Sequence, residues 1–199
     1  MIVHAVGVAG AGVGTVWLLL EHACCLPKAE LLSVCLYMVT LAGTLLSSTL
    51  YNFLPPGRRK EVLRRIDHAM IYALIAGTYT PFAVHHIIRT QGNAHGLGIV
   101  WGVALAGIGL KVVFPRRLER LGFALYLGLG WAVAVLAPSV WSSLTIPTLA
   151  LVLAGGVLYT VGSMIHLMTT VAYHNAAWHV LVVAAAGCHF VAVALVSTS

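Results

Sequence analysis

The sequence has very little charge: only 8% of its residues are Asp, Glu, Lys or Arg, and only 5 of its 199 residues are acidic. Hydrophobic residues make up 60% of the chain. Because an ordinary soluble domain carries about 25% charged residues, this composition excludes that class. The composition is that of an integral membrane protein.

The sequence also lacks the alternation of apolar and polar residues that membrane β-strands show. Its apolar residues form long runs, and about 20 such residues suffice for one helical span. Lipid offers no partner for backbone amides, so these runs are expected to be helices. We predict one domain, residues 1–199, that is a bundle of seven transmembrane helices. The spans are predicted at about 3–20, 31–54, 67–87, 96–114, 121–138, 146–166 and 175–196.

No disulfide framework or cleaved leader is indicated. Cys35 and Cys188 fall inside apolar runs and Cys24 and Cys25 are adjacent, so the cysteines are predicted to be small buried residues. The first apolar run starts without a basic region and is followed by Glu21, with no small-residue cleavage site. We therefore expect it to be a retained helix.

Basic residues gather in the predicted loops after the second and fourth spans, and only Lys28 and Arg89 lie in odd-numbered loops. Since cytoplasmic loops carry the excess of Lys and Arg, we predict a cytoplasmic N-terminus and a C-terminus outside. Such charge beside a span indicates contact with anionic headgroups, not with nucleic acid. The loop between the second and third spans holds Arg58, Arg59, Lys60, Arg64 and Arg65, and the stretch around the loop after the fourth span holds Lys111, Arg116, Arg117 and Arg120.

This orientation brings several polar residues to one end of the bundle. Ser48 and Asn52 end the second span, Asp67 starts the third, and Asn175 and His179 start the seventh. Residues four apart share one helix face, as Ser48 does with Asn52. A carboxylate in an apolar helix costs roughly 2.5 to 3.5 kcal/mol at mid-bilayer, so Asp67 is expected to have a partner. We predict a polar cluster in the inner leaflet.

Four further polar or helix-breaking positions lie in the predicted spans. His4 starts the first span and His85 ends the third at the opposite end, and both are expected to be interface residues. His189 lies deep in the seventh span and needs a hydrogen-bond partner. Pro81 is expected to kink the third span, with Thr78 as a donor for a freed carbonyl.

Five segments resemble a known family. They are Asp67–Phe82 (DHAMIYALIAGTYTPF), Ser47–Asn52 (SSTLYN), Trp101-Gly102, Ala154–Gly162 (AGGVLYTVG) and Trp178-His179-Val180. In these segments the chain resembles the haemolysin III group of the progestin and adipoQ receptor (PAQR) superfamily. The resemblance runs over nearly the whole chain, and Asp67–Phe82 is its most specific part.

The resemblance implies a seven-helix bundle in a bacterial inner (cytoplasmic) membrane, with a zinc ion near the cytoplasmic face. In the family, zinc is bound by the His of a Ser-x-x-x-His motif in helix 2 and by a His-x-x-x-His motif in helix 7. The helix 3 Asp holds a zinc-bound water, and the superfamily includes ceramide hydrolases. Zinc with an open position lowers the pKa of bound water to about 7 and polarises a carbonyl. By this resemblance Asp67 and Ser48 are candidate catalytic residues, and His179 and Asp67 are candidate metal ligands.

Two of the three family histidines are replaced by Asn in this chain, at Asn52 and Asn175. An amide oxygen suits calcium or magnesium and an imidazole suits zinc, so both replacements lower the expected zinc affinity. His174 and His166 are possible substitutes. His174 and His179 lie five residues apart, about 140° around a helix, so they face one metal only if a π-bulge restores the register.

Three classes of function are compatible with these features. The first is a metal-dependent hydrolase of a lipid amide or ester, around Asp67 and His179. The second is a protein of membrane-lipid homeostasis or sensing, in which a hydrogen-bonded polar cluster without a metal is formed by Asn52, Asp67, Asn175 and His179. The third is a transporter or pore, for which inverted repeats and paired broken helices are not found. The Asn replacements favour the second class, with membrane lipids or a lipid-like ligand as partners.

Overall fold

The computed structural model describes residues 2–22, 25–92, 94–114, 119–136, 138–170 and 172–198. The regular elements in these ranges are α-helices. They are α1 (Ile2–His22), α2 (Lys28–Phe53), α3 (Arg58–Thr90), α4 (His95–Val113), α5 (Glu119–Leu136), α6 (Pro138–Ser142), α7 (Ile146–Leu167) and α8 (His174–Ser197).

Six of these helices, α1 to α4 with α7 and α8, are long and apolar enough to cross a membrane. In α5 the described apolar stretch is shorter, Leu121–Ala132. The prediction of a helical integral membrane bundle is therefore confirmed. The count of seven crossings stays a prediction.

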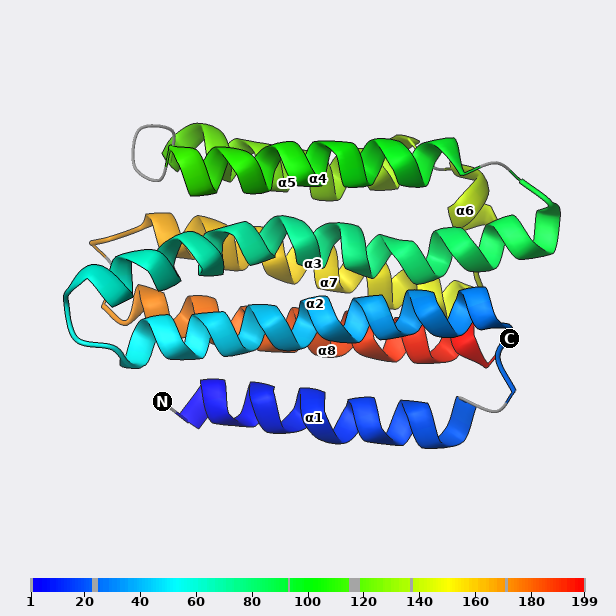
Figure 1. The fold of residues 1–199 in the computed structure, drawn as a ribbon, viewed down its shortest axis with the longest axis horizontal. Coiled ribbons are helices and arrows are strands. Elements are labelled where there is room, and N and C mark those ends of the chain that lie inside the picture. The colour runs from blue at the N-terminus through cyan, green and yellow to red at the C-terminus, as the bar shows by residue number, and fades with distance from the viewer. Residues whose placement is uncertain are drawn as a thin grey trace.

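The long helices run side by side, with α1 at one edge of the bundle and α4 and α5 at the opposite edge (Figure 1). The two termini lie at opposite ends of the bundle. The connections from α2 to α3 and from α7 to α8 lie at the end where the chain starts. The end of α2, the start of α3 and the start of α8 therefore share one end.

Close packing of α2 on α3 fixes the helix pair that carries Asp67. A Cβ at Gly77 would collide with the Thr40 side chain, and a Cβ at Gly43 would collide with Met70. Glycine at these positions lets the two backbones approach, as small residues do between membrane helices. Thr44 Oγ1 donates to the Met70 carbonyl at 3.2 Å, which adds a polar contact between the helices.

The best-buried large side chains lie on α2 and α3. Tyr37 and Tyr72 are 0% exposed and Phe82 is 1% exposed. Tyr72 Oη donates to the Gly122 carbonyl at 2.8 Å, which ties α3 to α5. Only 17–22% of the spans in α1, α4 and α7 is buried, as expected for helices that face lipid.

The predicted basic loop before the third span is helical. α3 begins at Arg58, nine residues before the predicted start, so Asp67 lies in its third turn and not at its first residue. Pro55-Pro56-Gly57 ends α2, and a new helix starts directly after it. With 33 residues, α3 is about 50 Å long, which exceeds the roughly 30 Å hydrocarbon core. The extra length is the basic segment.

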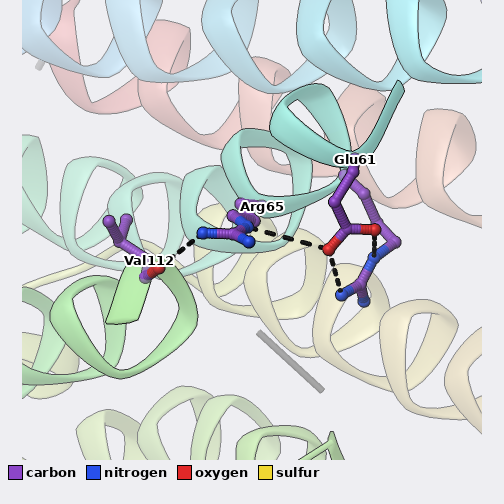
Figure 2. A network of polar contacts seen from close by, with 4 residues as sticks. Glu61, Arg65 and Val112 are labelled. Carbon is purple, nitrogen blue, oxygen red and sulfur yellow. Dashed lines mark hydrogen bonds and ion pairs between the residues drawn. The ribbon is translucent and has the colours of Figure 1, made fainter. Parts of the chain in front are cut away.

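Ion pairs stabilise this segment and a hydrogen bond attaches it to α4, as Figure 2 shows. Glu61 accepts a hydrogen bond from Arg64 at 3.0 Å and pairs with Arg65 at 3.7 Å. Pairs three and four residues apart support a helix, which explains why these residues are not a loop. Arg65 Nη1 also donates to the Val112 carbonyl at 3.4 Å, near the end of α4 where carbonyls lack helical partners.

Lys111 lies in the fourth helix, inside the predicted span and next to the basic loop, and its side chain is buried. Lys111 is 5% exposed in the last turn of α4, and its Nζ lies beside Gly122 of α5. Its long stem lets it pack between two helices. Arg116 and Arg117 lie outside the described residues. The short helix α6 was not predicted.

The expected burial of the cysteines is wrong for Cys25, which is exposed between α1 and α2. Cys35 and Cys188 are half-buried and free. Cys24 lies outside the described residues.

α3 continues as one helix through Pro81. Thr80 Oγ1 donates to the Ala76 carbonyl at 2.7 Å and accepts a hydrogen bond from Trp101 Nε1 at 3.1 Å. Thr80, and not the expected Thr78, is therefore the hydroxyl that bonds the backbone next to the proline.

Candidate functional site

A cavity of about 610 Å³ lies inside the bundle. One of its ends is polar and the other is lined by aromatic residues that include Phe82 and Trp141. Asp67 and Phe82 are 15 residues apart on α3, so the cavity extends about 22 Å along that helix. The polar end includes every candidate site residue from the sequence: Ser48, Asn52, Asp67, His166, His174, Asn175 and His179.

Asp67 has a partner in the neighbouring helix. The Ser48 side chain interacts with the Asp67 carboxylate, which links α2 to α3. One turn later on α2, Asn52 Nδ2 donates to the Ser48 carbonyl at 2.8 Å. Ser48 therefore contacts the carboxylate, and Asn52 follows it on the same face of α2.

His4 is a member of this cluster that sequence reasoning set aside. Its Nε2 lies 3.5 Å from Asn52 Nδ2, and its ring centroid lies 4.2 Å from that of His179. Helices α1, α2 and α8 thus meet through these three side chains. The sequence did indicate this position, because the predicted topology already placed His4 at the end of the bundle that carries Asn52 and His179.

His166 and His174 face each other across the connection from α7 to α8. Their ring centroids are 6.0 Å apart, and the His166 ring lies 5.5 Å from that of Trp178. The Nδ1 atom of each histidine is buried and has no hydrogen-bond partner in the part of the chain that the structure describes. Asn175 lines the same cavity but is exposed.

The residues at the family ligand positions fit zinc poorly. Asn52 and Asn175 are exposed amides, and Asn52 directs its nitrogen at Ser48 and His4. Within the described ranges, no three residues of the types His, Cys, Asp and Glu are arranged to hold a metal ion. We derive no chemical step through a metal, and the lowered zinc affinity expected from the sequence stays a prediction.

His189 has the hydrogen-bond partner that its depth in the bundle requires, which confirms that prediction. Its Nε2 lies 3.1 Å from the Val152 carbonyl of α7. Its ring also lies 5.5 Å from that of Tyr159, centroid to centroid. His189 therefore joins α7 to α8 in the wall of the cavity.

The apolar helices and the cavity between them define a multi-pass integral membrane protein with a polar site inside the bundle. A family model described as haemolysin-III related matches residues 1–190, so the chain belongs to that family, as its motifs predict. The chain is 33% identical over 189 residues to the Hemolysin-3 homolog of Bacillus subtilis (strain 168), which covers 95% of this chain and 88% of that protein. It is also 34% identical over 146 residues to Hemolysin-3 of Bacillus cereus, and this match covers 73% of this chain and 66% of that protein.

Proposed function

We propose that this protein binds a membrane lipid in its cavity and serves in membrane-lipid homeostasis or sensing. The observation that carries the proposal is the form of the cavity, which extends about 22 Å along α3 from a polar end at Asp67 to an aromatic end at Phe82. A lipid headgroup suits the polar end and an acyl chain suits the rest. The volume, about 610 Å³, is in the range of ligand pockets.

The polar end of this cavity works without a metal in this proposal. Ser48 interacts with Asp67, and His4 contacts both Asn52 and His179. Since a buried polar group left without a partner costs about 1–3 kcal/mol, these contacts stabilise the cluster without a cation. The cluster then acts as a hydrogen-bonding surface for a headgroup.

A metal-dependent lipid amide hydrolase is the second candidate. It is supported by the buried Nδ1 atoms of His166 and His174, which are imidazole nitrogens without a partner among the described residues. In that case Asp67 is the catalytic carboxylate, Ser48 positions it, and His179 is a ligand. Zinc would then be held by a rearranged set of residues.

We also propose that α5 is the seventh crossing, that the N-terminus is cytoplasmic and that the C-terminus is outside. The termini lie at opposite ends of the bundle, which requires an odd number of crossings (Figure 1). Arg58 and Arg59 are exposed at the end that carries the N-terminus, as the positive-inside rule requires of the cytoplasmic side. The relatives are bacterial, which favours the inner membrane.

Filling the cavity tests the proposed function. Gly156 lines the cavity, so Gly156→Phe should fill part of it and weaken binding of a fluorescent single-chain lipid to the purified protein by about tenfold. Gly109→Phe is the matched control, because Gly109 is exposed and a Cβ there meets nothing within 4 Å. Equal lipid affinity of wild type and both variants would contradict the proposal.

A further inference from the structure

The polar end of the cavity contains a lysine as well as Asp67. Among the described residues that line the cavity, Lys60 is the one lysine or arginine and Asp67 is the one carboxylate. The two residues lie seven positions apart on α3, which is about 10 Å and nearly two full turns, so they share one face of the helix. The polar end therefore offers a positive group and a negative group at two depths.

Two contacts with the end of α2 position the ammonium group of Lys60. Its Nζ donates to the Leu54 carbonyl at 2.9 Å and lies 5.2 Å from the centroid of the Tyr51 ring. Tyr51 also lines the cavity, so the ring holds the ammonium group beside it. An ammonium group has three N–H donors. After the bond to Leu54, donors remain for a ligand.

The charge of Lys60 is not neutralised by the protein. In the part of the chain that the structure describes, no carboxylate forms an ion pair with it. The adjacent acidic residue, Glu61, is paired with Arg64 and Arg65. Lys60 is half-buried, and a charge that is partly removed from water is stabilised by a counter-ion. The site therefore favours an anionic group on the ligand.

The depth of Lys60 matches that of lipid headgroups. It is the third residue of α3 and lies in the basic segment by which this helix exceeds the hydrocarbon core. Phe82, at the aromatic end of the cavity, is 22 residues or about 33 Å further along α3. A lipid with its charged group at Lys60 therefore places its glycerol near Asp67 and its acyl chain along the rest of the cavity.

We propose that the lipid in this cavity has a net anionic headgroup that contains phosphate, and that Lys60 binds this phosphate. The inference rests on the proposed lipid-binding function and names the class of its ligand. Lysine binds phosphate as a point charge. Glycerol hydroxyls of the same ligand donate to Asp67, since an ionised carboxylate is a hydrogen-bond acceptor. Phosphate of this kind occurs in phospholipids and in soluble phosphate esters, and the acyl-chain end of the cavity favours the lipid.

The test compares lysophosphatidylglycerol with a monoacylglycerol of the same acyl chain, on purified protein in an uncharged detergent. The wild type should bind the phosphate-containing lipid about tenfold more tightly. Lys60→Gln should remove this preference and leave the affinity for monoacylglycerol unchanged, because glutamine still offers a donor to the Leu54 carbonyl. Arg59→Gln is the matched control. It makes the same change in net charge, but Arg59 is exposed and is not among the residues that line the cavity, so the preference should remain.

Equal affinity of the wild type for both lipids would overturn the role of Lys60, and so would a preference that persists in Lys60→Gln or disappears in Arg59→Gln. If Lys60→Gln does not fold, Lys60→Met replaces it, since methionine keeps an apolar stem against Tyr51, and the same loss of preference is expected. Glycerol phosphate that competes as strongly as the lysophospholipid would reject a lipid as the ligand. Failure of both lipids to bind the wild type would contradict the proposed function itself, so the two failures are distinguishable.

Discussion

At the scale of single residues, the polar end of the cavity consists of side chains that bind one another across helices. Asp67 interacts with Ser48, and His4 contacts both Asn52 and His179. The roles of these residues differ between the two candidate functions. A metal site needs Asp67 as a carboxylate, whereas a polar cluster needs it as a hydrogen-bond acceptor.

Substitution of Asp67 separates these roles. Asp67→Ala leaves the Ser48 hydroxyl without its partner and should destabilise the protein by about 1–3 kcal/mol. Asp67→Asn keeps an acceptor oxygen, so the unfolding midpoint and lipid binding should stay near wild type. Both are measured on purified protein. A loss of function in Asp67→Asn as large as in Asp67→Ala, with the fold intact, would favour the hydrolase.

Zinc content tests the two Asn replacements. We expect the wild type to hold well under one zinc per chain after dialysis against a weak chelator, measured by elemental analysis. The double change Asn52→His and Asn175→His should raise the zinc content, since it restores three imidazoles and places position 175 four residues before His179. Stoichiometric zinc in the wild type would instead support a rearranged site with His166 or His174.

At the scale of helices, the α2–α3 pair is the unit that carries both ends of the cavity. It joins Ser48 to Asp67 at one end and Glu30 to His85 at the other. Between these contacts the two backbones approach closely at Gly77. The geometry of the cavity wall therefore depends on how tightly these two helices pack.

Gly77→Ala tests this packing. The new Cβ would collide with the branched Thr40 side chain, and overpacking of this kind costs about 1–3 kcal/mol. We expect a lower unfolding midpoint and weaker lipid binding. Gly109→Ala is the control, because nothing lies within 4 Å of its Cβ and alanine is the better helix former. If both variants have the same unfolding midpoint and lipid affinity, the close approach of the two helices at Gly77 does not determine stability or lipid binding.

At the scale of the whole molecule, the orientation in the membrane decides which side the polar end of the cavity faces. The basic first turns of α3 and the N-terminus share one end, and the C-terminus lies at the other (Figure 1). If the positive-inside rule applies, the polar end faces the cytoplasm.

Reporter fusions test this orientation. A reporter that is active only in the cytoplasm should be active after Arg59 and inactive after Ser199, and a reporter active only outside should give the opposite result. Activity in the same compartment at both positions would exclude seven crossings. Expression of both fusions is checked by immunoblot, so that a fusion protein that is not made is not mistaken for one whose reporter lies in the other compartment.

The sequence by itself determined the membrane class, the helical runs and the family, because hydropathy and the Asp67–Phe82 motif are local properties of the chain. It also brought Ser48, Asn52 and Asp67 to one end, since helices that cross a membrane must alternate in direction. The start of α3 was missed because hydropathy alone does not detect a basic helix stabilised by Glu61 and Arg65.

Only the tertiary structure decided which polar side chains meet. His4 and His179 lie on the first and last long helices, and Glu30 and His85 on neighbouring ones. Whether such residues touch depends on how each helix is rotated and where it packs, and these are set by contacts such as Gly77 with Thr40. Hydropathy carries no information on rotation, so the partners of His4 and His85 became visible only in the folded bundle.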